Sequence, residues 1–131
     1  WSAAARANNP QLLYEITLPC NFSSAYIEAN SAILEAAGAR YAQLDMPAVL
    51  ELFDCFQRLD ITAALPRISA PTLVMVGEED ILKPRYYSEI IASQIPGALL
   101  VVVPGAGHAL CLEKPAAFNT LVLGFVEQHH E

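Results

Sequence analysis

The sequence predicts an α/β fold, with a helical first part followed by a β-α-β-α unit that contains a parallel strand pair. Two short apolar runs rich in β-branched residues lie at 72–76 and 99–103, and a helical pattern separates them. Strands joined through a helix run parallel, with a right-handed crossover. Because residues 1–65 show no strand signal, we divide the chain into 1–65 and 66–131.

Composition restricts the class of partner. The chain has 131 residues, of which 54% are hydrophobic, and its net charge is −7. With no basic run, nucleic acid and anionic membranes are not expected partners. The apolar runs are too short to span a bilayer, and no signal peptide is visible. The chain starts at Trp1 rather than Met, so we expect a piece of a longer protein.

The three cysteines are scattered, at Cys20, Cys55 and Cys111. They are too few and too far apart for a disulfide framework or a zinc site. They suggest a reducing compartment, and we expect a cytoplasmic location. Separately, we expect no metal or other cofactor.

Local signals predict short helices in the first part. Ser2–Ala7 is helix-prone and ends at an Asn-Asn-Pro sequence. Residues 11–16 form a short apolar segment whose secondary structure the sequence does not indicate, and Leu18–Phe22 predicts a loop. Ser23 and Ser24 are good N-caps for the next helix, which is expected to reach Ala37.

Gly38 follows that helix and is the expected C′ residue. Asp45 and Pro47 then begin a helix, whose expected buried stripe is Val49, Leu52, Phe53 and Phe56. Asp60 is placed to cap a short turn over residues 61–65.

The second part alternates strands and helices. Thr72–Val76 predicts a buried strand that ends at Gly77, and Pro84 stands at the expected first position of a helix that reaches about Gln94. Leu99–Val103 predicts the second strand. Pro115 begins the last helix, whose expected stripe is Phe118, Leu121, Val122 and Phe125.

His108 directly follows the second strand, in Gly105-Ala106-Gly107-His108. Glycines let a backbone turn sharply and approach other atoms closely. Histidine ordinarily exchanges protons near neutral pH, and ligands of open α/β sheets bind beyond the carboxyl ends of the strands. His108 is therefore a candidate proton-transfer residue; the alternative is a loop histidine that binds a carbonyl.

An acidic cluster, Glu78-Glu79-Asp80, follows the first strand. Parallel strands end on the same side of a sheet, so this cluster is expected near His108. A carboxylate there can fix the imidazole tautomer and stabilise the imidazolium. Asp80 is the preferred partner because it lies nearest the next helix; in the alternative, all three acids are turn and cap residues.

The glycines also invite a dinucleotide-binding interpretation, which we reject. The third small residue of that fingerprint falls at Leu110, and the next helix is expected only at Pro115. No later strand supplies an acid for the ribose.

Several motifs together resemble the C-terminal part of α/β-hydrolase-fold enzymes. They are Ala-Pro-Thr-Leu-Val-Met-Val-Gly-Glu-Glu-Asp, Ile-Pro-Gly-Ala, Val-Pro-Gly-Ala-Gly-His and Leu-Glu-Lys-Pro-Ala-Ala-Phe-Asn, in this order between residues 68 and 126. The resemblance implies that the two strands are the last two of an eight-stranded sheet, with Asp80 as triad acid and His108 as triad base. Residues 1–65 resemble the helical cap or lid of such enzymes.

The family's nucleophile stands in a Gly-x-Ser-x-Gly elbow, and this sequence has no such pentapeptide. The resemblance therefore implies a C-terminal fragment, inactive alone, of a serine hydrolase acting on a small apolar ester, lactone or similar acyl compound. Phe22, Tyr26 and Phe53 are candidate substrate-binding residues of the cap, with packing in the helical core as the alternative for each.

Two other function classes compete with an enzyme: a non-catalytic small-ligand-binding member of the same fold and a plain interaction domain. The presence of both Asp80 and His108 favours the enzyme, because a binder needs no such pair. Without the rest of the sheet, strand 72–76 has an open edge. We therefore expect the chain to self-associate, for example as a homodimer paired across a two-fold axis.

Overall fold

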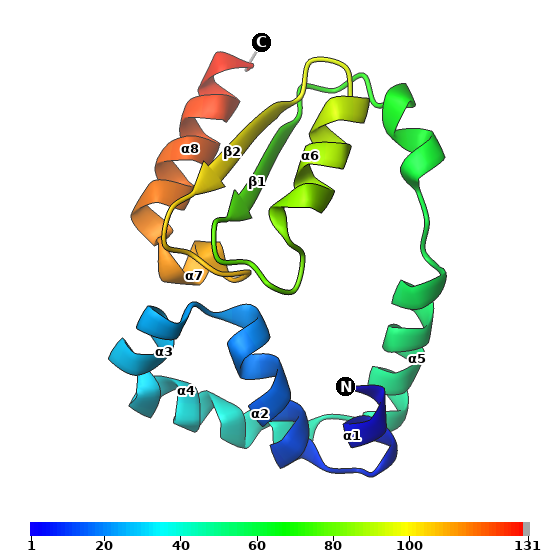
Figure 1. Ribbon diagram of the computed structural model, residues 1–131, viewed down its shortest axis with the longest axis vertical. Coiled ribbons are helices and arrows are strands. Elements are labelled where there is room, and N and C mark those ends of the chain that lie inside the picture. Colours follow the sequence, from blue (N-terminus) through cyan, green and yellow to red (C-terminus); the bar gives the residue numbers. More distant parts are fainter. Residues whose placement is uncertain (130–131) are drawn as a thin grey trace. The chain divides into compact units, whose positions relative to one another are not determined.

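The computed structural model describes residues 1–129 and divides into two compact units. One unit contains residues 1–19 and 24–60, and the other contains residues 20–23 and the chain from Ile61 onward. The elements in chain order are α1 (Ser2–Arg6), α2 (Pro10–Asn21), α3 (Ser24–Ala29), α4 (Ser31–Gly38), η1 (Ala39–Gln43), α5 (Met46–Arg58), η2 (Thr62–Arg67), β1 (Leu73–Gly77), α6 (Arg85–Gln94), β2 (Leu99–Val103), α7 (Leu110–Glu113) and α8 (Pro115–Gln128). Figure 1 shows this order.

The units differ from the predicted division at residue 65. The main boundary falls after Asp60, and the four residues 20–23 group with the second unit rather than with the helices around them. The predicted second domain ends at residues 130–131, which lie outside the described residues.

The first unit is held together by a small apolar core. Ala4 and Ala5 of α1, Leu13 of α2 and Met46 of α5 are buried together, and α1 packs along α5. Partly buried apolar side chains surround them: Ile16, Tyr41, Val49, Leu50 and Phe53. The alanine face of α1 lets that helix lie close to α5.

Helix α2 is longer than predicted. The loop predicted at Leu18–Phe22 is wrong for its first four residues, because α2 continues through Pro19 to Asn21. Pro19 lacks the N–H that would bond the carbonyl of Glu15, but Glu15 is exposed, so water can solvate that carbonyl. Near the end of a helix this loss is tolerated.

The predicted helix ending at Ala37 is in fact two helices. α3 and α4 are separated at Asn30, whose backbone is not helical (φ −126°, ψ 22°). Gly38 is not a left-handed C′ residue, since its φ is −57°. A Cβ on Gly38 would lie 2.8 Å from the Tyr14 ring, so this glycine is needed for close packing.

Helix α5 begins as predicted, with Asp45 as N-cap accepting a hydrogen bond from Ala48 N–H at 3.3 Å. Its predicted buried stripe is half wrong. Val49 and Phe53 pack against the core, but Leu52 and Phe56 are exposed. Met46 and Leu50 supply the remaining contacts of this helix with the core.

The second unit is built around two parallel strands, as predicted. β1 pairs with β2 in a register that places Leu73 opposite Leu99 and Gly77 opposite Val103. Phe118 and Leu121 of α8, both predicted, pack against a buried cluster of Val103, Ala106 and Leu110, as do Met75 and Val101 of the strands. α6 contacts both strands, and Figure 1 shows α6 and α8 on opposite sides of the pair.

The helices of this unit differ from the prediction in detail. Pro84 is the N-cap of α6 rather than its first helical residue. The short helix α7 was not predicted, and it occupies most of the connection between His108 and Pro115. Among residues 1–129, no helix is long and apolar enough to cross a membrane.

Candidate active site

The site is organised by a close approach between the end of β1 and the loop after β2. A Cβ on Gly77 would collide with the backbone oxygens of Ala106 and Gly107, so only glycine fits this position. Glu78 N–H bonds the Val103 carbonyl and Glu79 N–H bonds the Ala106 carbonyl, each at 2.9 Å. These contacts fix the acidic turn against the loop that carries His108.

Asp80 is the acid that turns inward from this cluster. Its side chain is only 5% exposed, whereas Glu78 and Glu79 are exposed. Asp80 Oδ1 accepts backbone hydrogen bonds from Leu82 at 2.9 Å and Lys83 at 2.7 Å. These donors compensate the burial of the carboxylate and hold its plane in one orientation.

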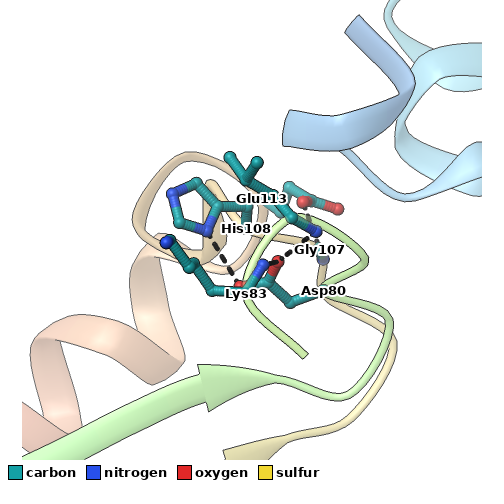
Figure 2. Close-up of polar contacts among 6 residues, drawn as sticks. Asp80, Lys83, Gly107, His108 and Glu113 are labelled. Atoms are coloured by element: carbon teal, nitrogen blue, oxygen red, sulfur yellow. Dashed lines mark hydrogen bonds and ion pairs between the residues drawn. The ribbon is translucent and has the colours of Figure 1, made fainter. Parts of the chain in front are cut away.

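The other oxygen of the same carboxylate faces the candidate base. Asp80 Oδ2 lies 2.8 Å from His108 Nδ1 (Figure 2). An ionised carboxylate can only accept hydrogen bonds, so this contact favours the imidazole tautomer that carries its proton on Nδ1 and its lone pair on Nε2. The imidazole is 38% exposed, which leaves it accessible to a reacting group.

Two glycines shape the loop that carries His108. Gly105 has a φ of +60°, the turn conformation that favours glycine. Gly107 does not have a positive φ but is buried, and a Cβ there would lie 2.8 Å from Ser23 N and 2.9 Å from Glu113 Oε1. One glycine therefore permits the turn, and the other permits the close approach expected from the sequence.

Segment 20–23 is held against this loop by hydrogen bonds. Ala109 N–H donates to the Asn21 carbonyl at 2.8 Å. Glu113 accepts from Gly107 N–H at 2.8 Å through Oε1, and from the Ser23 hydroxyl at 2.5 Å and the Ser23 N–H at 3.2 Å through Oε2. Figure 2 shows Glu113 beside Gly107 and His108.

The predicted substrate-binding residues fall in different units. Phe22 belongs to the unit of His108, and its backbone carbonyl carbon would lie 2.9 Å from a Cβ on Gly107. Tyr26 is in α3, and Phe53 in α5 contacts the Trp1 ring at 5.9 Å between centroids and packs on the core. The binding role of all three stays a prediction.

Within residues 1–129, no three His, Cys, Asp or Glu side chains gather closely enough to hold a metal ion. The three cysteines are free thiols. The chemistry that the described site can perform is proton transfer at His108 Nε2, with Asp80 stabilising the imidazolium.

The sequence does not predict two features of the site, the contact at Gly77 and the role of Glu113. Gly77 is predicted only as the end of a strand. Glu113 precedes Lys114 and Pro115 in one of the motifs of the resemblance, which was the available signal, but its partners lie 6 and 90 residues away.

Known proteins similar to this chain were found by family, by sequence and by structure. A family model described as the alpha/beta hydrolase family matches residues 2–121. A protein of Pseudomonas savastanoi pv. phaseolicola named "Putative carbamate hydrolase RutD" is 31% identical over 117 residues, covering 78% of this chain and 45% of that protein. A pimeloyl-[acyl-carrier protein] methyl ester esterase of Yersinia enterocolitica is 36% identical over 89 residues, covering 66% of this chain and 34% of the esterase.

A solved structure matches nearly the whole chain. It is an alpha/beta hydrolase enzyme from a Medee basin deep-sea metagenome library, with a TM-score of 0.89 and 29% sequence identity. The match covers 97% of this chain and 48% of the enzyme. This chain therefore spans about half the length of that enzyme. It spans less than half the length of each of the two related proteins.

Proposed function

This chain belongs to the alpha/beta hydrolase family, and we propose that it supplies the acid and the base of a serine-hydrolase catalytic triad. The observation that carries the proposal is the contact between Asp80 Oδ2 and His108 Nδ1 at 2.8 Å. Asp80 is buried and fixed by two backbone donors, while the imidazole remains accessible. This is the arrangement that orients a general base.

The reaction that follows is acyl transfer to a hydroxyl. His108 Nε2 takes the proton of a nucleophilic serine as its oxygen bonds the substrate carbonyl carbon, and Asp80 stabilises the imidazolium. His108 then returns the proton to the leaving oxygen as the ester bond breaks. Water repeats both steps on the acyl-enzyme and releases the acid.

The nucleophile comes from a segment outside the 131 residues. No Gly-x-Ser-x-Gly elbow occurs in this sequence, so we expect the chain alone to be inactive toward esters. The substrate class is a small apolar ester, lactone or similar acyl compound. The names of the relatives, a carbamate hydrolase and a methyl ester esterase, support an ester or similar acyl compound.

The test is turnover of p-nitrophenyl acetate and butyrate by the chain alone and by a longer protein that joins it to its nucleophile segment. We expect activity only in the longer protein, and none after His108→Ala. Asp80→Asn should lower kcat by about 10³–10⁴, because the amide favours the wrong imidazole tautomer. Glu79→Gln is the matched control: it is a neighbouring but exposed acid, and should leave the rate unchanged.

Two results would overturn this proposal. A longer protein that keeps full activity without His108 would reject the site. A longer protein inactive on a broad ester panel, but binding small apolar acyl compounds, would instead indicate the non-catalytic ligand-binding function.

The chain by itself is proposed to self-associate. Within the described residues β1 pairs only with β2, so its other edge offers free backbone donors and acceptors. Pairing of two β1 edges across a two-fold axis would build a continuous sheet. Sedimentation at micromolar concentration should then show a dimer, and a strictly monomeric species would contradict this mode.

A further inference from the structure

Glu113 is a half-buried carboxylate at the end of α7, and it joins three separate pieces of the second unit. Its Oε1 accepts from Gly107 N–H, in the loop just before His108. Its Oε2 accepts from both the N–H and the hydroxyl of Ser23. One side chain thus links α7, the loop of the base and segment 20–23.

Hydrogen bonds hold the backbone both before and after His108. The N–H of Gly107 is bound by Glu113, and the N–H of Ala109 is bound by the carbonyl of Asn21. The first of these amides belongs to the peptide group between Ala106 and Gly107, one removed from His108, and the second belongs to the peptide group between His108 and Ala109. Together the two bonds restrain the backbone before and after His108. Since that backbone sets the direction in which the His108 side chain leaves it, the bonds also restrain how the ring meets Asp80.

We propose that Glu113 is a positioning residue for His108. It does not touch the reacting atoms: it holds the loop so that His108 Nδ1 stays within hydrogen-bond distance of Asp80. The charge of Glu113 matters because a carboxylate accepts all three hydrogen bonds at once, and charge-assisted bonds are stronger than neutral ones. The importance of this role for catalysis rests on the proposed function of His108 as base.

The same loop offers a matched control in Glu78. Its carboxylate also accepts a hydrogen bond from a loop amide, that of Gly105, but at 3.2 Å and in an exposed position. Glu78→Ala and Glu113→Ala therefore remove the same charge and one loop contact each. Only Glu113→Ala removes the link beside His108.

The experiment is nuclear magnetic resonance of the ¹⁵N-labelled chain in a background with His129→Gln and His130→Gln, so that only the His108 ring is observed. Two quantities are measured: hydrogen exchange of the Gly107 amide and the resonance of the proton on His108 Nδ1. The amides of Val76 and Val102 in the strands report whether the fold is kept.

Glu113→Ala should speed exchange of the Gly107 amide on the order of tenfold or more and broaden or abolish the Nδ1–H resonance. Glu78→Ala should change neither. The inference is wrong if Glu113→Ala leaves both readouts unchanged, or if Glu78→Ala alters them equally.

If Glu113→Ala disrupts the strands, Ser23→Ala replaces it as the test. It removes one hydrogen bond to the carboxylate and should shift both readouts in the same direction by a smaller amount; no shift would again reject the inference. The Nδ1–H resonance reports the position of the His108 ring and not turnover. If the ester assay fails but the resonance still responds to Glu113→Ala, the proposed function is rejected and the positioning role of Glu113 is kept.

Discussion

Replacing Gly77 by alanine should be the most damaging of the six glycine-to-alanine substitutions in this chain. The added Cβ would collide with the backbone oxygens of Ala106 and Gly107, which cannot rotate away as a side chain could. Relief requires the loop to move from the strand end, and that movement lengthens the 2.9 Å bond from Glu79 N–H to the Ala106 carbonyl.

The magnitude follows from these two costs. Overpacking typically costs about 1–3 kcal/mol, and one lost backbone hydrogen bond costs about 1 kcal/mol. We therefore expect Gly77→Ala to lower the free energy of unfolding by roughly 2–4 kcal/mol. In a domain of this size the melting temperature should fall by about 10 °C. Urea denaturation and calorimetry measure both quantities.

Two other glycines provide controls for the same substitution. Gly124 lies inside α8 with no atom within 4 Å of the added Cβ, so Gly124→Ala should stabilise by about 0.5–1 kcal/mol. Gly97 has equal space but a φ of +73°, so alanine there should cost about 1 kcal/mol through backbone strain alone. The reasoning is refuted if Gly77→Ala proves as stable as Gly124→Ala.

Three further outcomes are expected. Asp45→Ala removes the N-cap of α5 and should cost about 0.5–1 kcal/mol in urea denaturation, near the low end for caps because the bond is long at 3.3 Å; an unchanged midpoint would show that the cap contributes nothing. Leu110→Ala empties a position that is 9% exposed and should cost about 2–3 kcal/mol, whereas Leu112→Ala, at a position 59% exposed, should stay within about 0.5 kcal/mol. Burial, and next the charge of Glu35, raise the pKa of Tyr14 above its ordinary 10.0, so the folded state holds that proton more tightly and stability falls as pH rises above 10.0. Tyr14→Phe should flatten that fall in urea titrations at increasing pH, and an identical slope would contradict the assignment.

The strand pair could be predicted because its signal is local. Leu99–Val103 matches the observed β2 residue for residue, and β1 is shifted by one residue from the prediction. Topology then placed the acidic turn near His108, since parallel strands end at the same edge. The structure has Asp80 in that place, and the catalytic role of the pair stays a prediction that the ester assay must test.

Features set by packing were not predictable from local pattern. A glycine at position 38 is typical of the residue just after a helix. Its actual role is to leave room for the ring of Tyr14, which lies 24 residues earlier in the chain. Phe56 has the spacing of a buried residue on α5, but it is 63% exposed. Helical periodicity shows which residues share a face; it does not show how much of that face a neighbour covers.

The division into units shows why the site is more than the strand pair. Apart from segment 20–23, the second unit consists of the chain from Ile61 onward. A boundary near residue 65 is therefore a natural prediction. Yet segment 20–23 supplies a carbonyl to Ala109 and two donors to Glu113. These bonds act on the residues flanking His108, so a chain cut at that boundary would keep the strands and lose contacts that hold the His108 loop. The second unit is therefore discontinuous in sequence, because segment 20–23 belongs to it through these bonds.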